Sequence, residues 1–169
     1  MINYDLDKIR LMAFDVDGVL SLTTTPLASD GDPVRTANTK DGYALHFAAK
    51  IGFDLAIISG GCSERVAARY RKLGVGEVFM QCGCKLEVYE MLLDRYGLGD
   101  ENVLYMGDDI PDLDIMRRCG LPCAPADAVP EVREAAVYVS HLRGGEGCCR
   151  DVVEQVLRAQ GKWCLDTIW

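Results

Sequence analysis

Long apolar runs are missing from this sequence of 169 residues. A membrane-spanning helix needs about 20 consecutive, mostly apolar residues, and no stretch of the chain provides them. The opening residues, MINYDLDKIR, also lack the basic start and the small-residue cleavage site of a secretory signal peptide. We therefore expect a cytoplasmic protein with no membrane segment.

Net positive charge is missing as well. The chain has 26 acidic against 18 basic residues, a formal net charge of −8, which argues against nucleic acid or an anionic membrane as the main partner. A small anionic substrate remains compatible, because a few local cations can outweigh the overall charge.

Zinc-type and disulfide-type cysteine spacing is absent, although the chain has eight cysteines. Their spacing fits neither a paired C-x2-C zinc pattern nor the disulfide framework of a small secreted domain. Our interpretation is that most are buried thiols that act as small hydrophobic side chains. Metal binding by Cys82 and Cys84 is the alternative, and it would need two further ligands that the sequence does not identify.

Repeats, low-complexity tracts and domain linkers are absent too, so we expect residues 1–169 to form one domain. Apolar runs of strand length alternate with amphipathic stretches, which is typical of an α/β fold with a doubly wound, mainly parallel sheet. The five predicted strands cover residues 10–14, 53–59, 77–81, 102–107 and 121–126. Helices are predicted over residues 41–52, 63–74, 85–97, 110–120, 130–136 and 147–160.

Two segments depart from this alternation. Residues 19–37 hold β-forming residues on both sides of the turn cluster SDGDP, which predicts an inserted β-hairpin, with an irregular loop as the alternative. Residues 143–169 hold a glycine-rich stretch, the last predicted helix and a tail with two tryptophans, which we expect to pack on another surface. No segment is long enough to form a separate cap domain.

Unusual polar residues follow the predicted strands. Asp15 and Asp17 end the first one in LMAFDVDGVL, Ser59 ends the second, Lys85 follows the third, and Asp108 and Asp109 follow the fourth. Each has an ordinary alternative: an aspartate can cap a helix or form a turn, Ser59 can be a turn residue, and Lys85 can be a solvated helix start. Ligands of open α/β sheets bind at the carboxyl ends of the strands, so finding all of these residues there predicts a joint site.

Several carboxylates at one site repel each other, and a bound Mg²⁺ would relieve that repulsion because it prefers oxygen ligands. Asp15 and Asp17 lie on the same side of an extended backbone, and Gly18 lets the chain turn directly after them. One carboxylate can attack phosphorus, and the other can donate a proton to the leaving oxygen and later accept one from water. This set of residues therefore predicts phosphoryl transfer.

The motifs DVDGV, IISGG, Lys85 and GDDIPD resemble, in that order, the four signature motifs of the haloacid dehalogenase-like phosphatases. The segments NTKDGY and GGEG resemble a narrower, capless branch that removes phosphate from keto-deoxy sugar acid phosphates in lipopolysaccharide synthesis. The resemblance covers nearly the whole chain. It implies a Mg²⁺-dependent homotetramer whose substrate is a small sugar-acid phosphate.

The resemblance also implies residue roles. Asp15 would be the nucleophile and a metal ligand, and Asp17 the general acid and base, binding metal through its backbone carbonyl. Ser59 would hold the phosphoryl group and Lys85 would balance its charge. Asp108 would be the third metal ligand, while a water on the metal would be held by Asp109 or Asp112.

Further positions match the family's substrate contacts: Asn38, Thr39, Lys40, Asp41, Gly42, His46, Gly60 and Arg69. His46 can equally be a packing residue and Arg69 a solvated charge. Two departures stand out, because Gly61 replaces an arginine that the family usually has, and QCGCK replaces a Q-G-Q-x-x-K pattern. The loss of a fixed guanidinium leaves the exact sugar acid open.

Three alternatives remain open. The substrate can be a nine-carbon, sialic-acid-type 9-phosphate instead of an eight-carbon one. The chain can be a phosphoacceptor signalling module, although Asp17 and the inserted segment argue against that. It can also be a silent oligomerisation domain, which the intact acidic and lysine positions disfavour.

Overall fold

A computed structural model describes residues 1–163 and contains one six-stranded sheet in the order β3-β2-β1-β4-β5-β6, with every pair parallel. The strands are β1 (Leu11–Phe14), β2 (Asp54–Ile58), β3 (Glu77–Phe79), β4 (Val103–Met106), β5 (Leu121–Ala124) and β6 (Tyr138–Val139). The predicted α/β fold is confirmed. The prediction of five strands is wrong, because β6 adds a sixth at the edge, and two residues are too few to give a strand pattern in the sequence.

The helices match the predicted positions. They are α1 (Thr39–Lys50), α2 (Glu64–Lys72), α3 (Lys85–Tyr96), α4 (Leu113–Met116), α5 (Pro130–Ala135) and α6 (Cys148–Ala159), with short 3₁₀ turns η1 (Leu6–Lys8), η2 (Asp100–Asn102) and η3 (Ile110–Asp112). The Ser63 hydroxyl caps α2 by accepting from the Val66 N–H, and α3 ends at Gly97 in the left-handed region. The stretch predicted as one helix over residues 110–120 divides into η3 and α4.

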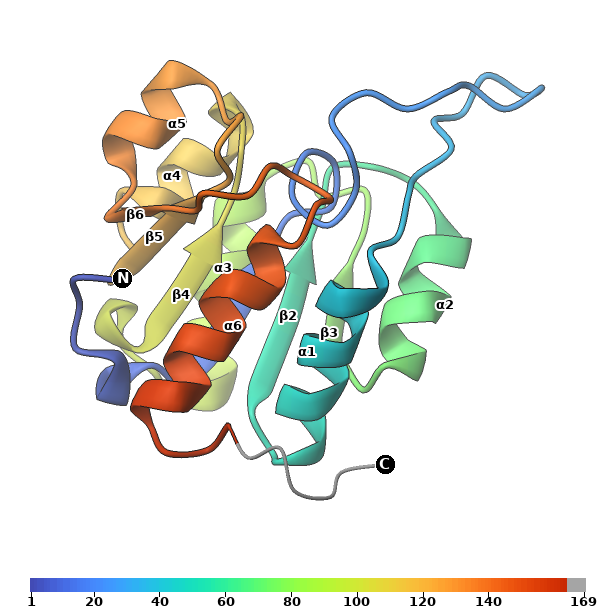
Figure 1. The fold of residues 1–169 in the computed structure, drawn as a ribbon. Coiled ribbons are helices and arrows are strands. Elements are labelled where there is room, and N and C mark those ends of the chain that lie inside the picture. The colour runs from blue at the N-terminus through green and yellow to red at the C-terminus, as the bar shows by residue number, and fades with distance from the viewer. Residues whose placement is uncertain (164–169) are drawn as a thin grey trace.

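The sheet lies between two layers of helices (Figure 1). Met12 and Phe14 face the core shared with α1, α2 and α6, whereas Leu11 and Ala13 face the core shared with α3, α4 and α5. Both faces of the sheet are therefore covered, which explains why its central strands are continuously apolar. None of the helices described is long and apolar enough to cross a membrane.

Residues 19–37 form a loop whose first three residues are buried and whose remainder projects beyond the carboxyl ends of the strands (Figure 1). It has a turn in which Ala28 N–H donates to Asp32 O at 2.8 Å, and one antiparallel bridge between Leu27 and Pro33. The predicted β-hairpin is wrong in that no strand pair forms around this turn. An isolated two-stranded ribbon is marginal without a third strand or a helix to cover it, and this loop has neither.

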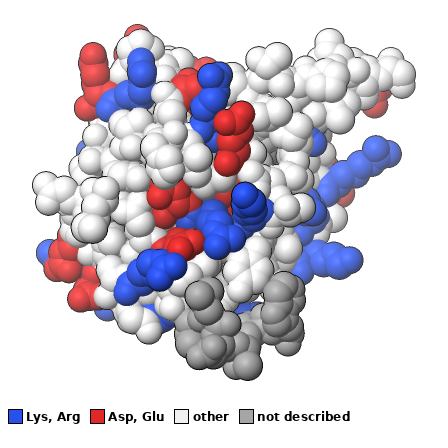
Figure 2. All heavy atoms as spheres, viewed as in Figure 1, with Lys and Arg blue, Asp and Glu red and all other residues white. Residues whose placement is uncertain are grey.

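Surface charges of both signs are interspersed on the face formed by α1 and α6 (Figure 2). Glu154 on α6 pairs with Arg150 at 3.1 Å and with Arg158 at 2.6 Å. Near the end of the described chain, Trp163 packs against Phe47 with ring centroids 4.8 Å apart. The part of the predicted tail packing that concerns residues 164–169 lies outside the described residues.

The cysteines of residues 1–163 fall into two groups. Cys119, Cys123, Cys148 and Cys149 are buried free thiols, as predicted, and burial raises the pKa of the Cys119 thiol to about 12. Cys62 and Cys84 are exposed and Cys82 is half-buried, and these three belong to the loops at the carboxyl ends of the strands.

Candidate active site

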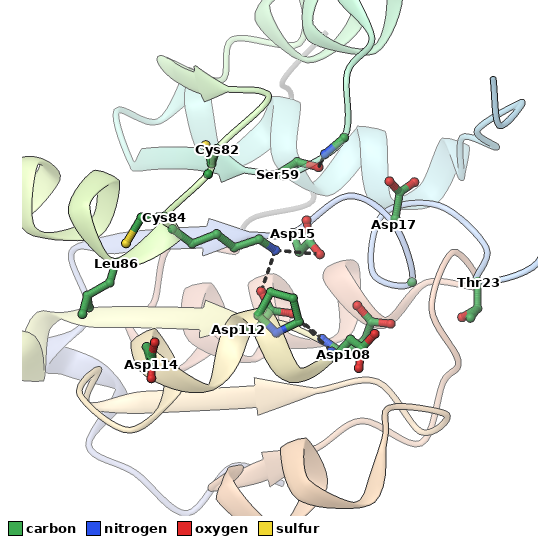
Figure 3. Close-up of a pocket in the computed structure, with 17 residues that line it drawn as sticks. Asp15, Asp17, Thr23, Ser59, Cys82, Cys84, Leu86, Asp108, Asp112 and Asp114 are labelled. Atoms are coloured by element: carbon green, nitrogen blue, oxygen red, sulfur yellow. Dashed lines mark hydrogen bonds and ion pairs between the residues drawn. The ribbon is translucent and has the colours of Figure 1, made fainter.

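A cavity of about 620 Å³ opens at the carboxyl ends of β1, β2 and β4. Its lining includes the polar residues that follow these strands: Asp15, Asp17, Ser59, Lys85 and Asp108 (Figure 3). The neighbours of β1 are β2 and β4, whose connections leave the sheet in opposite directions, and this is where α/β sheets form ligand crevices. The structure thus brings together the residues that the strand-end pattern predicted.

Lys85, the first residue of α3, bridges two carboxylates. Its Nζ lies 2.9 Å from Asp15 Oδ2 and 2.7 Å from Asp112 Oδ1, and its side chain is 7% exposed. Burial acts to lower the pKa of Lys85, but the two adjacent carboxylates outweigh it and the pKa is raised. Lys85 therefore stays charged and is not the solvated helix start that its sequence position also allowed.

Asp112 is buried and accepts four hydrogen bonds. Besides Lys85, it accepts from the Tyr105 hydroxyl at 2.6 Å and from the backbone N–H groups of Asp108 and Asp109 at 3.0 and 3.3 Å. These contacts hold the loop after β4 in place and use the oxygens of Asp112 fully. Asp112 thus contacts both the ammonium group of Lys85 and the backbone that carries Asp108.

Asp15 and Asp108 are carboxyl groups whose ionised form is disfavoured by their surroundings. Burial raises the pKa of Asp15 to about 6 although Lys85 lowers it, and burial with the charges of Asp15 and Asp112 raises the pKa of Asp108 to about 8. Oxygens of Asp15, Asp108 and Asp112 lie within 4.8 Å of one another. A divalent cation fits beside Asp15 and Asp108, because it would offset the repulsion and their carboxylate oxygens are hard donors.

Gly18 is required by this arrangement. Its φ is +81°, and a Cβ at this position would lie 1.9 Å from Asp108 Oδ2. Only glycine allows the turn after Asp17 to pass so close to the Asp108 carboxylate.

Asp17 stands apart from the other carboxylates (Figure 3). Its two oxygens accept from Arg35 Nε and Nη2, each at 2.8 Å. Sequence reasoning missed Arg35. It is the one basic residue of residues 19–37, but nothing in its local spacing connects it to Asp17.

The loop after β2 supplies Ser59 and Gly60. Ser59 is buried, and its hydroxyl oxygen accepts from the Gly61 N–H at 3.1 Å. Gly60 lines the cavity. Among the described residues, the one group of three or more possible metal ligands is the aspartate cluster, and Cys82 and Cys84 are not part of it.

The structure does not bring most of the predicted substrate contacts to this cavity. Of that set, only Gly60 lines it, whereas Asn38, Thr39, Lys40, Asp41, Gly42, His46 and Arg69 do not. Asp41 is buried and accepts from the Arg150 N–H at 2.7 Å, so it links α1 to the start of α6. Asn38 caps α1, and His46 Nδ1 lies 3.0 Å from the Leu73 carbonyl oxygen. Within one chain, the local geometry gives these three residues structural contacts.

Comparison with known proteins agrees with this geometry. The sequence profile of the haloacid dehalogenase-like hydrolases matches residues 56–147. The 3-deoxy-D-manno-octulosonate 8-phosphate phosphatase KdsC of Salmonella typhi is 37% identical over 156 residues, covering 92% of this chain and 83% of its own.

Solved structures give the same result. A probable YrbI family phosphatase from Pseudomonas syringae has a TM-score of 0.88 at 40% identity, covering 94% of this chain and 92% of its own. The 3-deoxy-D-manno-octulosonate 8-phosphate phosphatase of Moraxella catarrhalis, solved with magnesium, phosphate and the sugar acid KDO, has a TM-score of 0.88 at 31% identity, covering 94% and 91%. With the strand-end aspartates, Lys85 and the parallel sheet in place, the chain belongs to the haloacid dehalogenase-like hydrolases and is a phosphatase of that family.

Proposed function

We propose that this chain is a Mg²⁺-dependent phosphatase that hydrolyses 3-deoxy-D-manno-octulosonate 8-phosphate through an aspartyl-phosphate intermediate. The observation that carries the proposal is the buried Lys85 bridge between Asp15 and Asp112, with Asp108 completing a group of three carboxylates. The names of the relatives support the substrate, and the magnesium, phosphate and KDO of the Moraxella catarrhalis structure support the ion and the product.

In the first step, an Asp15 oxygen attacks phosphorus while the bond from phosphorus to the sugar oxygen breaks. Asp17 gives its proton to that leaving oxygen. In the second step, Asp17 takes a proton from water, the water oxygen attacks phosphorus, and the bond to Asp15 breaks to release phosphate. Lys85 and Ser59 hold the phosphoryl oxygens during both steps, since this chemistry depends mainly on position and charge.

Mg²⁺ would supply the positive charge that the aspartates and the phosphoryl group need. We assign the side chains of Asp15 and Asp108 and the backbone carbonyl of Asp17 as its protein ligands. Asp109 and Asp112 would orient water around it, although the four hydrogen bonds of Asp112 favour a role in fixing the loop.

We also propose that the chain acts as a single domain in a cytoplasmic homotetramer. The loop of residues 19–37 exposes Leu27 and Val34 at 70% and 47%, on either side of a turn that carries the exposed Asp30 and Asp32. A neighbouring subunit would cover these residues. Cover of this kind would also shield the reaction from water, because the described residues include no cap domain over the cavity.

The test is a phosphate-release assay with eight-carbon and nine-carbon keto-acid phosphates, with Mg²⁺ and with EDTA. We expect a higher kcat/KM for the eight-carbon substrate and loss of activity with EDTA that Mg²⁺ restores. A higher kcat/KM for the nine-carbon 9-phosphate would show that this compound is the substrate instead. It is the main alternative because Gly61 replaces an arginine that the family usually has. Absence of release from either substrate, or full activity in EDTA, would overturn the proposal.

A further inference from the structure

An ion pair joins the two ends of the projecting loop. Asp17 lies just after β1, before the loop begins, and Arg35 lies near the end of the loop, shortly before α1. The two hydrogen bonds of the pair are both 2.8 Å, which is the parallel fork geometry that arginine forms with a carboxylate. The Arg35 side chain is 7% exposed although the Asp17 side chain is 46% exposed, so the guanidinium is enclosed by the protein.

The backbone beside Arg35 is tied to the turn that carries Asp17. Thr36, the next residue, donates its N–H to Ser21 Oγ at 2.9 Å, and its hydroxyl oxygen accepts from Leu22 N–H at 3.0 Å. Ser21 is buried, and its carbonyl oxygen accepts from Gly18 N–H at 3.1 Å. The returning part of the loop is thus fixed against residues 18–22, and this places Arg35 next to Asp17.

Gly61 provides the space for this ion pair. A Cβ at position 61 would lie 2.5 Å from Arg35 Nη2 and 2.9 Å from Asp17 Oδ2. The φ of Gly61 is not in the positive range, so its backbone does not itself demand glycine. Neighbouring Gly60 would have a Cβ with no atom closer than 3.8 Å, an ordinary contact. The absence of a side chain at position 61 therefore leaves the space that the ion pair occupies.

We propose that Arg35 is a positioning residue for Asp17, and that Gly61 is the position that admits it. This rests on the proposed function, in which Asp17 gives a proton to the leaving oxygen and later takes one from water. The guanidinium pairs with the ionised carboxylate, and it keeps one of its two hydrogen bonds while the other Asp17 oxygen carries the proton. A half-exposed carboxylate has several accessible rotamers, and a two-pronged hydrogen bond from a fixed guanidinium selects one of them. Arg35 acts through Asp17 and does not touch the reacting phosphoryl group.

The experiment measures kcat/KM for the sugar-acid phosphate and for p-nitrophenyl phosphate with Mg²⁺. The variants are Arg35→Ala, Gly61→Ala, the double variant and Arg35→Lys. The controls are Arg65→Ala, an exposed arginine, and Gly76→Ala, whose Cβ would meet nothing within 4 Å. Circular dichroism and thermal melting show that each variant is folded.

We expect kcat/KM for the sugar-acid phosphate to fall about 10- to 100-fold in Arg35→Ala and Gly61→Ala, the range for a displaced catalytic group. The double variant should be no worse than either single one, because both changes break the same contact. Arg35→Lys should recover only part of the loss, since lysine cannot form the fork. Both controls should match the wild type.

The nitrophenyl ester separates positioning from a general structural role. Its leaving group departs as a stable anion and needs little protonation, so its kcat/KM should fall less than about threefold in Arg35→Ala. Equal losses on both esters, additive losses in the double variant, or wild-type rates in Arg35→Ala would each overturn the proposal. A wild type that hydrolyses neither ester would instead overturn the proposed function, and the role of Arg35 with it.

Discussion

Replacing Asp108 by asparagine should make the metal-free protein more stable although it removes a proposed metal ligand. Asp108 is a half-buried carboxylate close to the charges of Asp15 and Asp112, and these surroundings raise its pKa from 3.8 to about 8. Asparagine has nearly the same shape and no charge. The variant therefore keeps the packing and removes a charge that burial and the neighbouring carboxylates disfavour.

The size of the effect follows from the pKa of Asp108. At about 1.4 kcal/mol per pKa unit, a rise of this size corresponds to about 5 kcal/mol at pH 8. Because Asp108 is partly exposed and shares its repulsion with Asp15, we expect about 2 kcal/mol of added unfolding free energy in the variant.

The pH dependence has a definite sign. The folded protein keeps the Asp108 proton up to pH about 8, whereas the unfolded chain releases it near pH 3.8. Between these values the unfolded state binds fewer protons, so this group lowers the stability of the wild type as pH rises. The unfolding free energy of Asp108→Asn minus that of the wild type should therefore grow from pH 4 to pH 8 and stay constant above pH 8.

Urea unfolding in EDTA, followed by circular dichroism at pH 5, 7 and 8.5, measures this difference. Asp109→Asn is the matched control, because Asp109 is an exposed neighbour whose capping role asparagine can take over. Added Mg²⁺ should stabilise the wild type and have much less effect on Asp108→Asn. The reasoning would be refuted if Asp108→Asn were no more stable than the wild type at pH 8.5. It would also be refuted if the difference in unfolding free energy between the two proteins were the same at pH 5 and pH 8.5.

Three further predictions concern other parts of the molecule. Asp15→Asn should abolish phosphate release while circular dichroism stays unchanged, and appreciable turnover would exclude this residue as the nucleophile. Lys85→Met should lower the unfolding free energy by about 3–5 kcal/mol, because it leaves Asp15 and Asp112 without their buried cation. Exposed Lys72→Met is the control in the same urea experiment, and equal losses would contradict the ion-pair argument. Light scattering should give a tetramer that Leu27→Asp dissociates, and a fully active wild-type monomer would contradict the assembly.

The strand-end residues could be predicted because their placement follows from topology. Once residues 11–14 and 103–106 are adjacent parallel strands, the aspartates after them must lie at one edge. The caps of α2 and α3 were equally local, since Ser63 and Gly97 act within a few residues of their own positions.

The remaining features depend on contacts between distant segments. Asp41 stands in a polar stretch at the start of α1, and only the packing of α6 makes it a buried residue. Arg35 meets Asp17 because a loop of 17 intervening residues returns to its origin, and no periodicity encodes that return. The hairpin prediction failed for a related reason, because strand-forming residues need a neighbouring surface to pair on.

The division of the cysteines has a practical consequence for labelling. Among the described residues, the thiols within the core have raised pKa values and no access to reagent, whereas Cys62 and Cys84 are exposed near the opening of the cavity. Of these described thiols, a maleimide dye applied to the native protein would therefore modify the two beside the cavity. Such a fluorophore offers a direct optical reporter of ligand entry, with no engineered attachment point.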